Sequence, residues 1–349
     1  MIHSKSVISV TGTNGKGSTV AFCEAILLAA GYRVGAYYSP HVFHISERVK
    51  INGKPITLPT SDNFNFAEFT QQAIDLFNET PLDAVILEVG IGGRLDPVNL
   101  LIEPDVSGIT NVEFDHQDRL GNTLESIGFE KAHLYRPHKP AIFGAENIPK
   151  SVLDYAKKIQ TELSCYKKDF NYKIYGNQWE FSSHKITYKN LPLPILTLHD
   201  AAIALEALSY LPLDINYDAI CEGLRLANLP GRFKIITEPV MQIFDVAHNP
   251  ASALLLAEKL KQLPCEGKTF AVVDIREDKD ISGTLRPLLN MVDGWFVGSQ
   301  VIGAYLPDSV LFSDIGKAYQ SALKQMGPKD RILVFGSFKT VGALCPDKN

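Results

Sequence analysis

Cysteine is scarce in this sequence, which has five cysteines among 349 residues and no C-x-x-C spacing. This scarcity argues against a zinc site or a disulfide framework and favours reduced thiols in a cytoplasmic protein. No stretch approaches the ~20 apolar residues that a membrane span requires. The apolar run Val7–Val10 is too short for a signal peptide and leads directly into a glycine loop. We therefore expect a soluble protein with no membrane partner.

The sequence also has no surplus of basic residues, because its formal net charge is −5. A general nucleic-acid binder would carry a basic face, so no nucleic-acid partner is expected. Anionic small molecules remain compatible with this charge, since a local nest of backbone N–H groups can hold phosphate in an acidic protein. Apolar residues make up 45% of the chain, which is ordinary for globular domains, and the length favours two of them.

Apolar segments alternate with helix-forming segments over the first 150 residues. We expect strands at Ser6–Thr11, Arg33–Tyr38, Asp83–Val89 and Asp105–Thr110, a helix at Lys16–Ala30 and a hairpin within Glu47–Ile56. Strands separated by helices predict an α/β fold with a doubly wound parallel sheet. Ligands of such sheets bind at the carboxyl ends of the strands.

The pattern changes after residue 170. Short alternating segments over Tyr172–Lys189 predict a small antiparallel appendage, and two helices follow at Asp200–Ser209 and Asp218–Ala227. Leu229-Pro230-Gly231 then indicates a linker, so we place one domain at residues 1–229 and a smaller Rossmann-like α/β domain at 230–349. A second βα series is expected there, with strands at Ile235–Glu238, Gln242–Val246, Thr269–Asp274, Gly294–Val297 and Arg331–Phe335.

A glycine-rich loop between the first strand and the first helix is the clearest candidate for a binding site. It consists of Gly12, Thr13, Asn14, Gly15, Lys16, Gly17 and Ser18. Glycines let backbone N–H groups approach phosphates, and a helix N-terminus favours anions. Lys16 would supply a charge for the β and γ phosphates, and Ser18 a hydroxyl for Mg²⁺. The loop is shorter than G-x-x-x-x-G-K-[ST], with a glycine between the lysine and the serine.

These residues begin a series of motifs that resembles the Mur ligase superfamily, in particular its folylpolyglutamate synthase/dihydrofolate synthase branch. The matching motifs are Val10–Ser18, Tyr38–His41, Glu47-Arg48-Val49, Leu87–Asp96, Asp115-His116, Glu125–Gly128, Glu130-Lys131-Ala132, Leu191–Pro194, Leu229–Phe233, Asp245–Pro250 and Gly336-Ser337-Phe338. They occur in family order over nearly the whole chain. The resemblance implies an enzyme, a P-loop ligase that uses ATP and Mg²⁺, with two metal sites expected.

The resemblance also implies the reaction. ATP would phosphorylate a pterin-linked carboxylate, of dihydropteroate or folylpolyglutamate, and the amine of L-glutamate would attack the acyl phosphate to form an amide. Like charges meet in the first step, so cations must neutralise them. The family's metal ligands correspond to Ser39, Glu88 and His116, although imidazole is an unusual ligand for Mg²⁺. Lys131 corresponds to a lysine that is carbamylated, and Lys16, His116 and Lys131 are the catalytic candidates.

Two further sets of residues follow from the same resemblance. The expected ATP-binding residues are Thr13, Asn14, Gly15, Lys16, Gly17, Ser18, Asp200, Arg232 and Asp245. The expected acceptor-binding residues are Phe66, Glu68, Phe69, Arg94, Leu95 and Asp96, with the aromatic rings stacking on the pterin. From the residues alone, Asp245 is equally compatible with a helix cap before Asn249-Pro250. The phenylalanines are equally compatible with the apolar face of a helix.

The sequence departs from the family at several positions. It begins almost at the first strand, whereas the family has a preceding helical segment that helps to bind dihydropteroate, so weaker pterin binding or a misplaced start is expected. Asp200 stands where the family has an asparagine that contacts ATP, and a carboxylate only accepts hydrogen bonds and repels phosphate. Ala67 replaces a phenylalanine, and the loops near Asp274–Arg276 and Val301–Ala304 are altered. Two alternatives therefore stay open, a ligase for another acceptor and a non-catalytic nucleotide-binding descendant. By analogy with the family we expect a monomer with small-molecule substrates.

Overall fold

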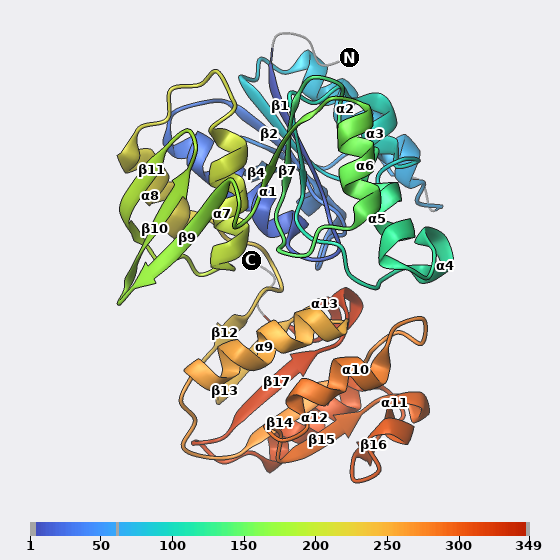
Figure 1. Ribbon diagram of the computed structural model, residues 1–349. Coiled ribbons are helices and arrows are strands. Elements are labelled where there is room, and N and C mark those ends of the chain that lie inside the picture. The colour runs from blue at the N-terminus through green and yellow to red at the C-terminus, as the bar shows by residue number, and fades with distance from the viewer. Residues whose placement is uncertain (1–4, 61–62, 347–349) are drawn as a thin grey trace. The chain divides into compact units, whose positions relative to one another are not determined.

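The computed structural model describes residues 5–60 and 63–346. The chain divides into two compact units, residues 1–229 and 230–349, and the division falls between Leu229 and Pro230. Figure 1 labels the helices and strands of both units.

An eight-stranded sheet forms the centre of the first unit, with the strand order β4-β3-β2-β5-β1-β6-β7-β8. Its strands are β1 (Ser6–Thr11), β2 (Val34–Tyr37), β3 (Val49–Ile51), β4 (Lys54–Pro55), β5 (Ala84–Glu88), β6 (Val106–Ile109), β7 (Pro140–Phe143) and β8 (Glu162–Cys165). The six strands from β2 to β8 in this order are parallel, whereas β3 and β4 pair antiparallel at one edge. The predicted parallel sheet and the predicted hairpin are confirmed. The sheet has two strands more than predicted, β7 and β8.

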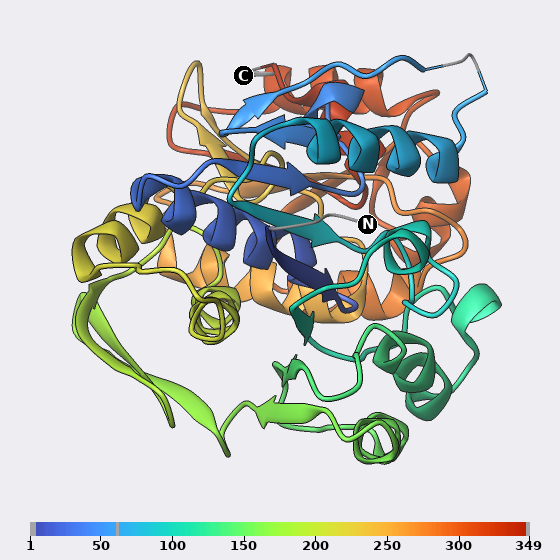
Figure 2. The same cartoon turned by 90° about the horizontal axis from the view of Figure 1, so that it is seen from above.

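Helices cover both faces of this sheet, because side chains of each central strand alternate between two cores. Its helices are α1 (Lys16–Ala29), η1 (Ile45–Arg48), α2 (Phe66–Glu79), α3 (Pro97–Leu101), α4 (Gln117–Leu120), α5 (Leu124–Ala132), α6 (Lys150–Lys158), α7 (Leu198–Leu208) and α8 (Tyr217–Leu226). Ile8 and Val10 of β1 point into a core shared with α1, α7 and α8. Val7 points to the other face, into the core shared with α2 and α3. Figure 2 shows α1 and α2 on opposite sides of the sheet.

The predicted antiparallel appendage is a three-stranded sheet of β9 (Phe170–Tyr175), β10 (Gln178–Ser183) and β11 (Thr187–Pro192). It is drawn in yellow-green in Figure 1. Trp179 and Phe181 of β10 are fully buried in the same core as α7. Apolar side chains on one side of this small sheet thus attach it to the first unit.

The second unit contains a six-stranded sheet in the order β12-β13-β17-β14-β15-β16. Its strands are β12 (Lys234–Ile236), β13 (Met241–Asp245), β14 (Thr269–Val273), β15 (Gly294–Val297), β16 (Val310–Leu311) and β17 (Arg331–Phe335). Its helices are α9 (Pro250–Gln262), α10 (Ile281–Leu285), η2 (Arg286–Leu288), α11 (Gln300–Tyr305), α12 (Ile315–Gln325) and α13 (Phe338–Leu344). The strands are parallel except β12, which pairs antiparallel with β13 and therefore does not begin a βα unit.

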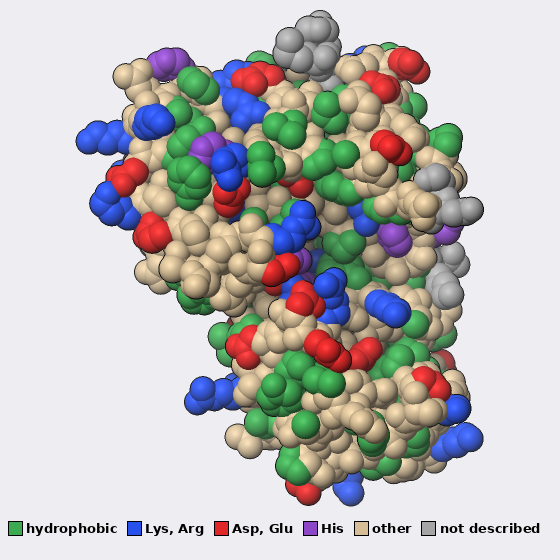
Figure 3. Space-filling model, turned by 90° about the vertical axis from the view of Figure 1, so that its right-hand side faces the viewer, with side chains coloured by type: hydrophobic (Ala, Val, Ile, Leu, Met, Phe, Trp, Pro, Cys, Tyr) green, Lys and Arg blue, Asp and Glu red, His purple; other side chains and the backbone are tan. Residues whose placement is uncertain are grey.

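No helix in the described part of the chain is long and apolar enough to cross a membrane. On the face displayed in Figure 3, Lys and Arg side chains are interspersed with Asp and Glu side chains.

Candidate active site

The phosphate loop joins β1 to α1 with a backbone that glycine alone adopts easily. Gly12 has φ +153° and Gly15 has φ +85°. A Cβ on Gly12 would lie 3.0 Å from Cβ of Thr110 and would collide with its hydroxyl. A side chain at this position would therefore displace the loop from β6.

Hydrogen bonds hold the loop in place. The amides of Thr13 and Asn14 both donate to Oδ1 of Asn111, at 3.1 and 2.9 Å. The ammonium of Lys16 donates to the carbonyls of Gly12 (3.1 Å) and Thr13 (3.2 Å), so it folds back over the loop. Ser18, two residues into α1, is buried. The loop thus presents a cation and a helix N-terminus at one place, which is favourable for an anion.

Other candidate residues follow neighbouring strands of the same parallel sheet. In the register of the sheet, Val10 of β1 lies beside Glu88 of β5, and Thr11 lies beside Ile109 of β6. Tyr37 of β2 lies beside Leu87. The carboxyl ends of the four adjacent strands β2, β5, β1 and β6 therefore meet along one side of the sheet. Ligands of parallel sheets bind on this side.

Glu88 and Ser39 are in direct contact on this side. The amide of Ser39 donates to Oε2 of Glu88 at 3.0 Å, and Glu88 is only 5% exposed. A Cβ on Gly17 would lie 3.2 Å from the same oxygen, so the carboxylate lies against the start of α1. A buried carboxylate with a neighbouring hydroxyl is a donor set that suits a hard divalent cation. The residues present therefore fit Mg²⁺.

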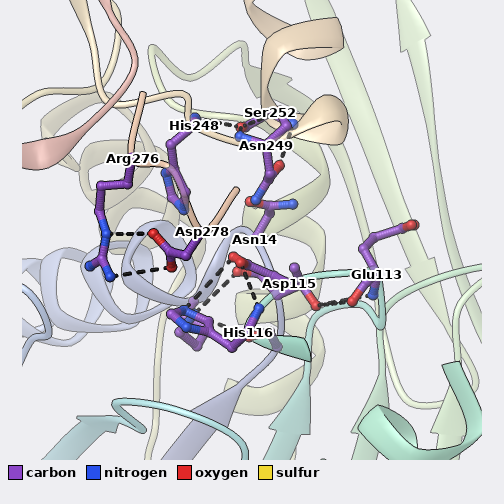
Figure 4. Close-up of polar contacts among 12 residues, drawn as sticks. Asn14, Glu113, Asp115, His116, His248, Asn249, Ser252, Arg276 and Asp278 are labelled. Atoms are coloured by element: carbon purple, nitrogen blue, oxygen red, sulfur yellow. Dashed lines mark hydrogen bonds and ion pairs between the residues drawn. The ribbon is translucent and has the colours of Figure 1, made fainter. Parts of the chain in front are cut away.

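His116 lies on a loop that is tied to the phosphate loop. It has φ +49° and precedes α4 as its N-cap residue. Its amide donates to Oδ1 of Asp115 at 2.8 Å, and its Nε2 lies 3.8 Å from Oδ2 of the same residue, as drawn in Figure 4. Thr13 connects the two loops, because its hydroxyl donates to the carbonyl of Glu113 and accepts from the amide of Glu113. Within residues 5–60 and 63–346, no three His, Cys, Asp or Glu side chains form a group that could hold a metal.

Lys131 is a buried lysine of α5, only 3% exposed. Burial and, to a smaller extent, the positive charge of Lys16 lower its pKa to about 7, against the opposing effects of Asp115 and Asp96. A Cβ on Gly93 would lie 3.0 Å from the carbonyl oxygen of Lys131, so the loop after β5 packs closely on this part of α5. Lys131 therefore carries a substantial neutral fraction near neutral pH.

Asp96 caps the helix α3. Its carboxylate accepts hydrogen bonds from the amides of Val98 and Ile91, both at 3.0 Å. Burial raises its pKa to about 6 in spite of these hydrogen bonds. The two residues before it are exposed. Leu95 is 70% exposed, and the side chain of Arg94 forms an ion pair with Glu130 at 2.9 Å. This loop thus offers an exposed apolar side chain, Leu95, beside a buried carboxyl group, that of Asp96.

The predicted aromatic residues of α2 differ in their environment. The ring of Phe66 lies against Gly90, whose Cβ would be 2.7 Å from Cζ of Phe66. Glu68 is exposed. Phe69 is 2% exposed and packs on Tyr37 in the core beneath α2. Phe69 is thus a core ring in this structure, and apolar periodicity in the sequence does not distinguish a core ring from a binding ring.

In the second unit, Asp245 lies at the end of β13. Its carboxylate accepts from the amides of Phe233 (2.9 Å) and Ala247 (2.8 Å), and burial raises its pKa while Arg232 opposes this rise. The N-cap of α9 is Asn249, so the alternative role of Asp245 as that cap is wrong. Figure 4 shows the capping contacts around Asn249. The guanidinium of Arg232 lies 5.1 Å from the ring centre of Phe338.

Sequence reasoning assigned no role to three side chains around Ser39. The hydroxyl of Tyr38 donates to Glu24 of α1 at 2.6 Å, and Lys50 lies 3.7 Å from the same carboxylate. Arg48 is buried and donates to the hydroxyl of Ser39 at 3.3 Å. The motif Glu47-Arg48-Val49 was the available signal, but it does not indicate where the arginine points.

A comparison with known protein families identifies the class of protein. The Mur ligase middle domain matches residues 10–201, and the Mur ligase glutamate ligase domain matches residues 231–338. The dihydrofolate synthase/folylpolyglutamate synthase of Escherichia coli is 39% identical over 359 residues, which cover 96% of this chain and 85% of that protein. The corresponding protein of Haemophilus influenzae is 35% identical, with 96% and 87% covered.

Solved structures agree with these relatives. The Escherichia coli FolC complex with DHPP and ADP has a TM-score of 0.91 and 38% identity, covering 97% of this chain and 87% of that one. A bifunctional folylpolyglutamate synthase/dihydrofolate synthase with Mn, AMPPNP and L-glutamate bound also has a TM-score of 0.91 and 38% identity, covering 98% and 89%. The chain belongs to the dihydrofolate synthase/folylpolyglutamate synthase family of the Mur ligases. It is an ATP-dependent ligase.

Proposed function

We propose that this ligase joins L-glutamate to a pterin-linked carboxylate, of dihydropteroate, folylpolyglutamate or both, through an acyl phosphate. The family supports this substrate class, since its relatives are named for these two activities. The observation that carries the proposal is the contact between the phosphate loop and a buried carboxylate, Oε2 of Glu88 beside Gly17. This arrangement suits a nucleotide that must be bound together with a divalent cation.

The first step forms the acyl phosphate. An oxygen of the acceptor carboxylate attacks the γ-phosphorus of ATP, and the bond from that phosphorus to the bridging oxygen breaks to release ADP. Lys16 lies over the phosphate loop and stabilises the charge on the phosphate oxygens. Mg²⁺, held by Ser39, Glu88 and His116, would neutralise the charges that meet as carboxylate and triphosphate approach. Arg232 and Asp245 of the second unit are proposed contacts of the nucleotide.

The second step forms the amide. The amine of L-glutamate attacks the carbonyl carbon, the bond from carbon to the phosphate oxygen breaks, and the nitrogen loses a proton. Phosphate leaves with one oxygen of the original carboxylate. Phe66, Arg94, Leu95 and Asp96 are proposed to contact the pterin end of the acceptor.

We assign Lys131 as the site of a carbamate. A neutral amine is required to add carbon dioxide, and the pKa of Lys131, about 7, supplies one near neutral pH. The product is an anion, which the ammonium of Lys16 would stabilise, since Lys16 is close enough to lower the pKa of Lys131. Carbamylation thus removes the repulsion between the buried Lys131 and the partly buried Lys16.

We further propose that the enzyme acts in the cytoplasm on small molecules alone. All five cysteines are free thiols, which is compatible with a reducing compartment. The mixed charges in Figure 3 form no extended basic patch on that face.

The test is an assay of ADP formation with and without dihydropteroate, tetrahydrofolate and L-glutamate. We expect ADP, phosphate and the glutamyl amide in equal amounts, with mass spectrometry identifying the amide. An acceptor labelled with ¹⁸O in its carboxylate should transfer one labelled oxygen to phosphate. Ligation without this transfer would exclude the acyl phosphate, and ATP binding with no turnover on any acceptor would favour the non-catalytic alternative.

A further inference from the structure

Arg48 is a buried arginine whose hydrogen-bond partners are uncharged. Only 7% of the residue is exposed. Its Nε donates to Nδ1 of His41 at 2.9 Å, and its Nη1 donates to the hydroxyl of Ser39 at 3.3 Å. Among the residues that the structure describes, no carboxylate forms an ion pair with Arg48. A buried guanidinium is costly unless an anion accompanies it.

The surroundings of Arg48 keep these partners neutral. Nδ1 of His41 accepts from Nε of Arg48, so this nitrogen carries no proton. Burial lowers the pKa of Arg48, although Glu88, Glu47 and Tyr37 oppose this. Arginine stays protonated even so. The site therefore contains a permanent positive charge in a poorly solvated place.

Two aromatic rings flank the guanidinium. Its central carbon lies 5.1 Å from the ring centre of Phe64 and 5.8 Å from that of Phe66. Phe64 is 44% exposed, so one of these two rings lies at the surface. Phe66 in turn lies against Gly90 and near Asp96, and both Phe66 and Asp96 are proposed contacts of the pterin.

The position of Arg48 is built into the fold. The carboxylate of Glu47 accepts from three successive amides, those of Val42 (2.9 Å), Phe43 (2.7 Å) and His44 (2.6 Å), which fixes the loop before η1. The carbonyl of Arg48 accepts from the amide of Tyr38 at 2.8 Å. The side chain is thereby directed between Ser39 on one side and Phe66 on the other.

From this placement we propose that Arg48 binds the carboxylate of the acceptor and aligns it for attack on ATP. The inference rests on the proposed function and adds a substrate-positioning residue to it. The guanidinium lies between Phe66 and Ser39. The heterocycle of the acceptor would stack on Phe66, and its reacting carboxylate would lie near Ser39 and Glu88. Its planar N–H groups match a carboxylate in a bidentate geometry, and the bound anion would form a direct ion pair with Arg48, which no described carboxylate of the protein does.

The experiment uses the full chain with Arg48→Met, which keeps apolar bulk, and Arg48→Lys, which keeps the charge but loses the planar fork. Arg33→Met is the matched control, because Arg33 is an exposed arginine at the other end of β2, paired with Asp83 at 2.8 Å. We expect the KM for dihydropteroate to rise about ten-fold or more in Arg48→Met, with a smaller rise in Arg48→Lys. The KM for ATP should change less than about two-fold, and Arg33→Met should match the wild type.

A second measurement separates binding of the carboxylate from support of Phe66. The probe is dihydropteroate in which hydrogen replaces the carboxyl group, and its binding is measured by calorimetric titration. Wild type and Arg48→Met should bind this probe equally, whereas they should differ by about ten-fold or more for dihydropteroate. Equal losses for both compounds, or an unchanged KM for dihydropteroate, would overturn the inference while the ligase function stands. If the wild type ligates no pterin carboxylate, the proposed function itself fails. Should Arg48→Met not fold, the same pair of titrations on Arg48→Lys decides the question.

Discussion

The carboxylate of Asp200 lies directly against Gly15 of the phosphate loop: a Cβ on Gly15 would be 2.9 Å from Cγ of Asp200 and closer to its Oδ1. Asp200 is in the first turn of α7, and Gly15 is the N-cap residue of α1. The N-terminus of α1 is the place where a phosphate would gain from the helix dipole. An acidic side chain beside it competes for the same favourable potential.

The first prediction concerns this competition. Asp200→Asn should tighten ATP binding about ten-fold, which corresponds to ~1.4 kcal/mol, because it removes a negative charge next to the phosphates. The amide also gains an N–H donor. Calorimetric titration of ATP into both proteins measures the change. Unchanged or weaker binding by the variant would show that the carboxylate serves another contact at this loop.

The second prediction concerns Lys16. Lys16→Ala should reduce ligation about 10²–10³-fold, because the charge over the loop stabilises the transferring phosphoryl group. Lys54→Ala, at an exposed position of β4, is the control for loss of a lysine elsewhere in the unit. Circular dichroism should show that both variants are folded. Near-normal turnover by folded Lys16→Ala would exclude this loop as the phosphate site.

The central strands of the first unit could be predicted because they are buried on both faces. Ser6–Thr11 and Ala84–Glu88 are buried along their whole length and give short apolar runs bounded by polar residues. The segment Val310–Leu311 has only two residues, both exposed, so it has too little pattern to be read as a strand. The antiparallel direction of Lys234–Ile236 depends on its partner and not on its own residues.

From the residues alone, without the family resemblance, the candidate site was predictable only where its chemistry is local. The phosphate loop is contiguous, so its glycines and Lys16 are visible in the sequence. Lys131 and Arg48 have ordinary neighbours in sequence, and only the fold buries them. Phe69 fits an apolar helix face equally well whether that face meets a ligand or the core, and here it meets Tyr37.

The third prediction concerns the metal. Glu88→Gln should raise the Mg²⁺ concentration needed for half-maximal activity, because a neutral amide is a weaker ligand for a hard dication. The amide oxygen of the new side chain can still accept from Ser39, so the fold should persist. Glu206→Gln is the matched control, since Glu206 is equally buried but bonded to Ser164. Superimposable Mg²⁺ titrations of Glu88→Gln and wild type would exclude Glu88 as a ligand.

The fourth prediction is a pH-dependent stability effect at Lys131. Its pKa is about 7 in the folded protein and 10.5 in the reference state, so the unfolded chain binds more protons between these values. Stability contributed by this group therefore rises with pH from about 7 to 10.5 and is lowest below pH 7. In buffer free of carbon dioxide, Lys131→Met should raise Tm most at pH 6, and the gain should shrink towards pH 10. A gain that is constant with pH would show that packing, and not charge burial, causes it.

The last prediction tests the carbamate itself. Only the neutral amine reacts with carbon dioxide, so the carbamylated fraction should fall as the pH drops below the pKa of Lys131, about 7. Carbon-13 NMR of the protein in labelled bicarbonate should show a carbamate signal at pH 8 that Lys131→Arg lacks, because arginine stays protonated. Ligation by the wild type should depend on bicarbonate after exhaustive removal of carbon dioxide, and Lys131→Arg should be inactive with or without it. If the signal is absent and activity is independent of bicarbonate, Lys131 acts as a free amine, and its low pKa then reflects burial beside Lys16 alone.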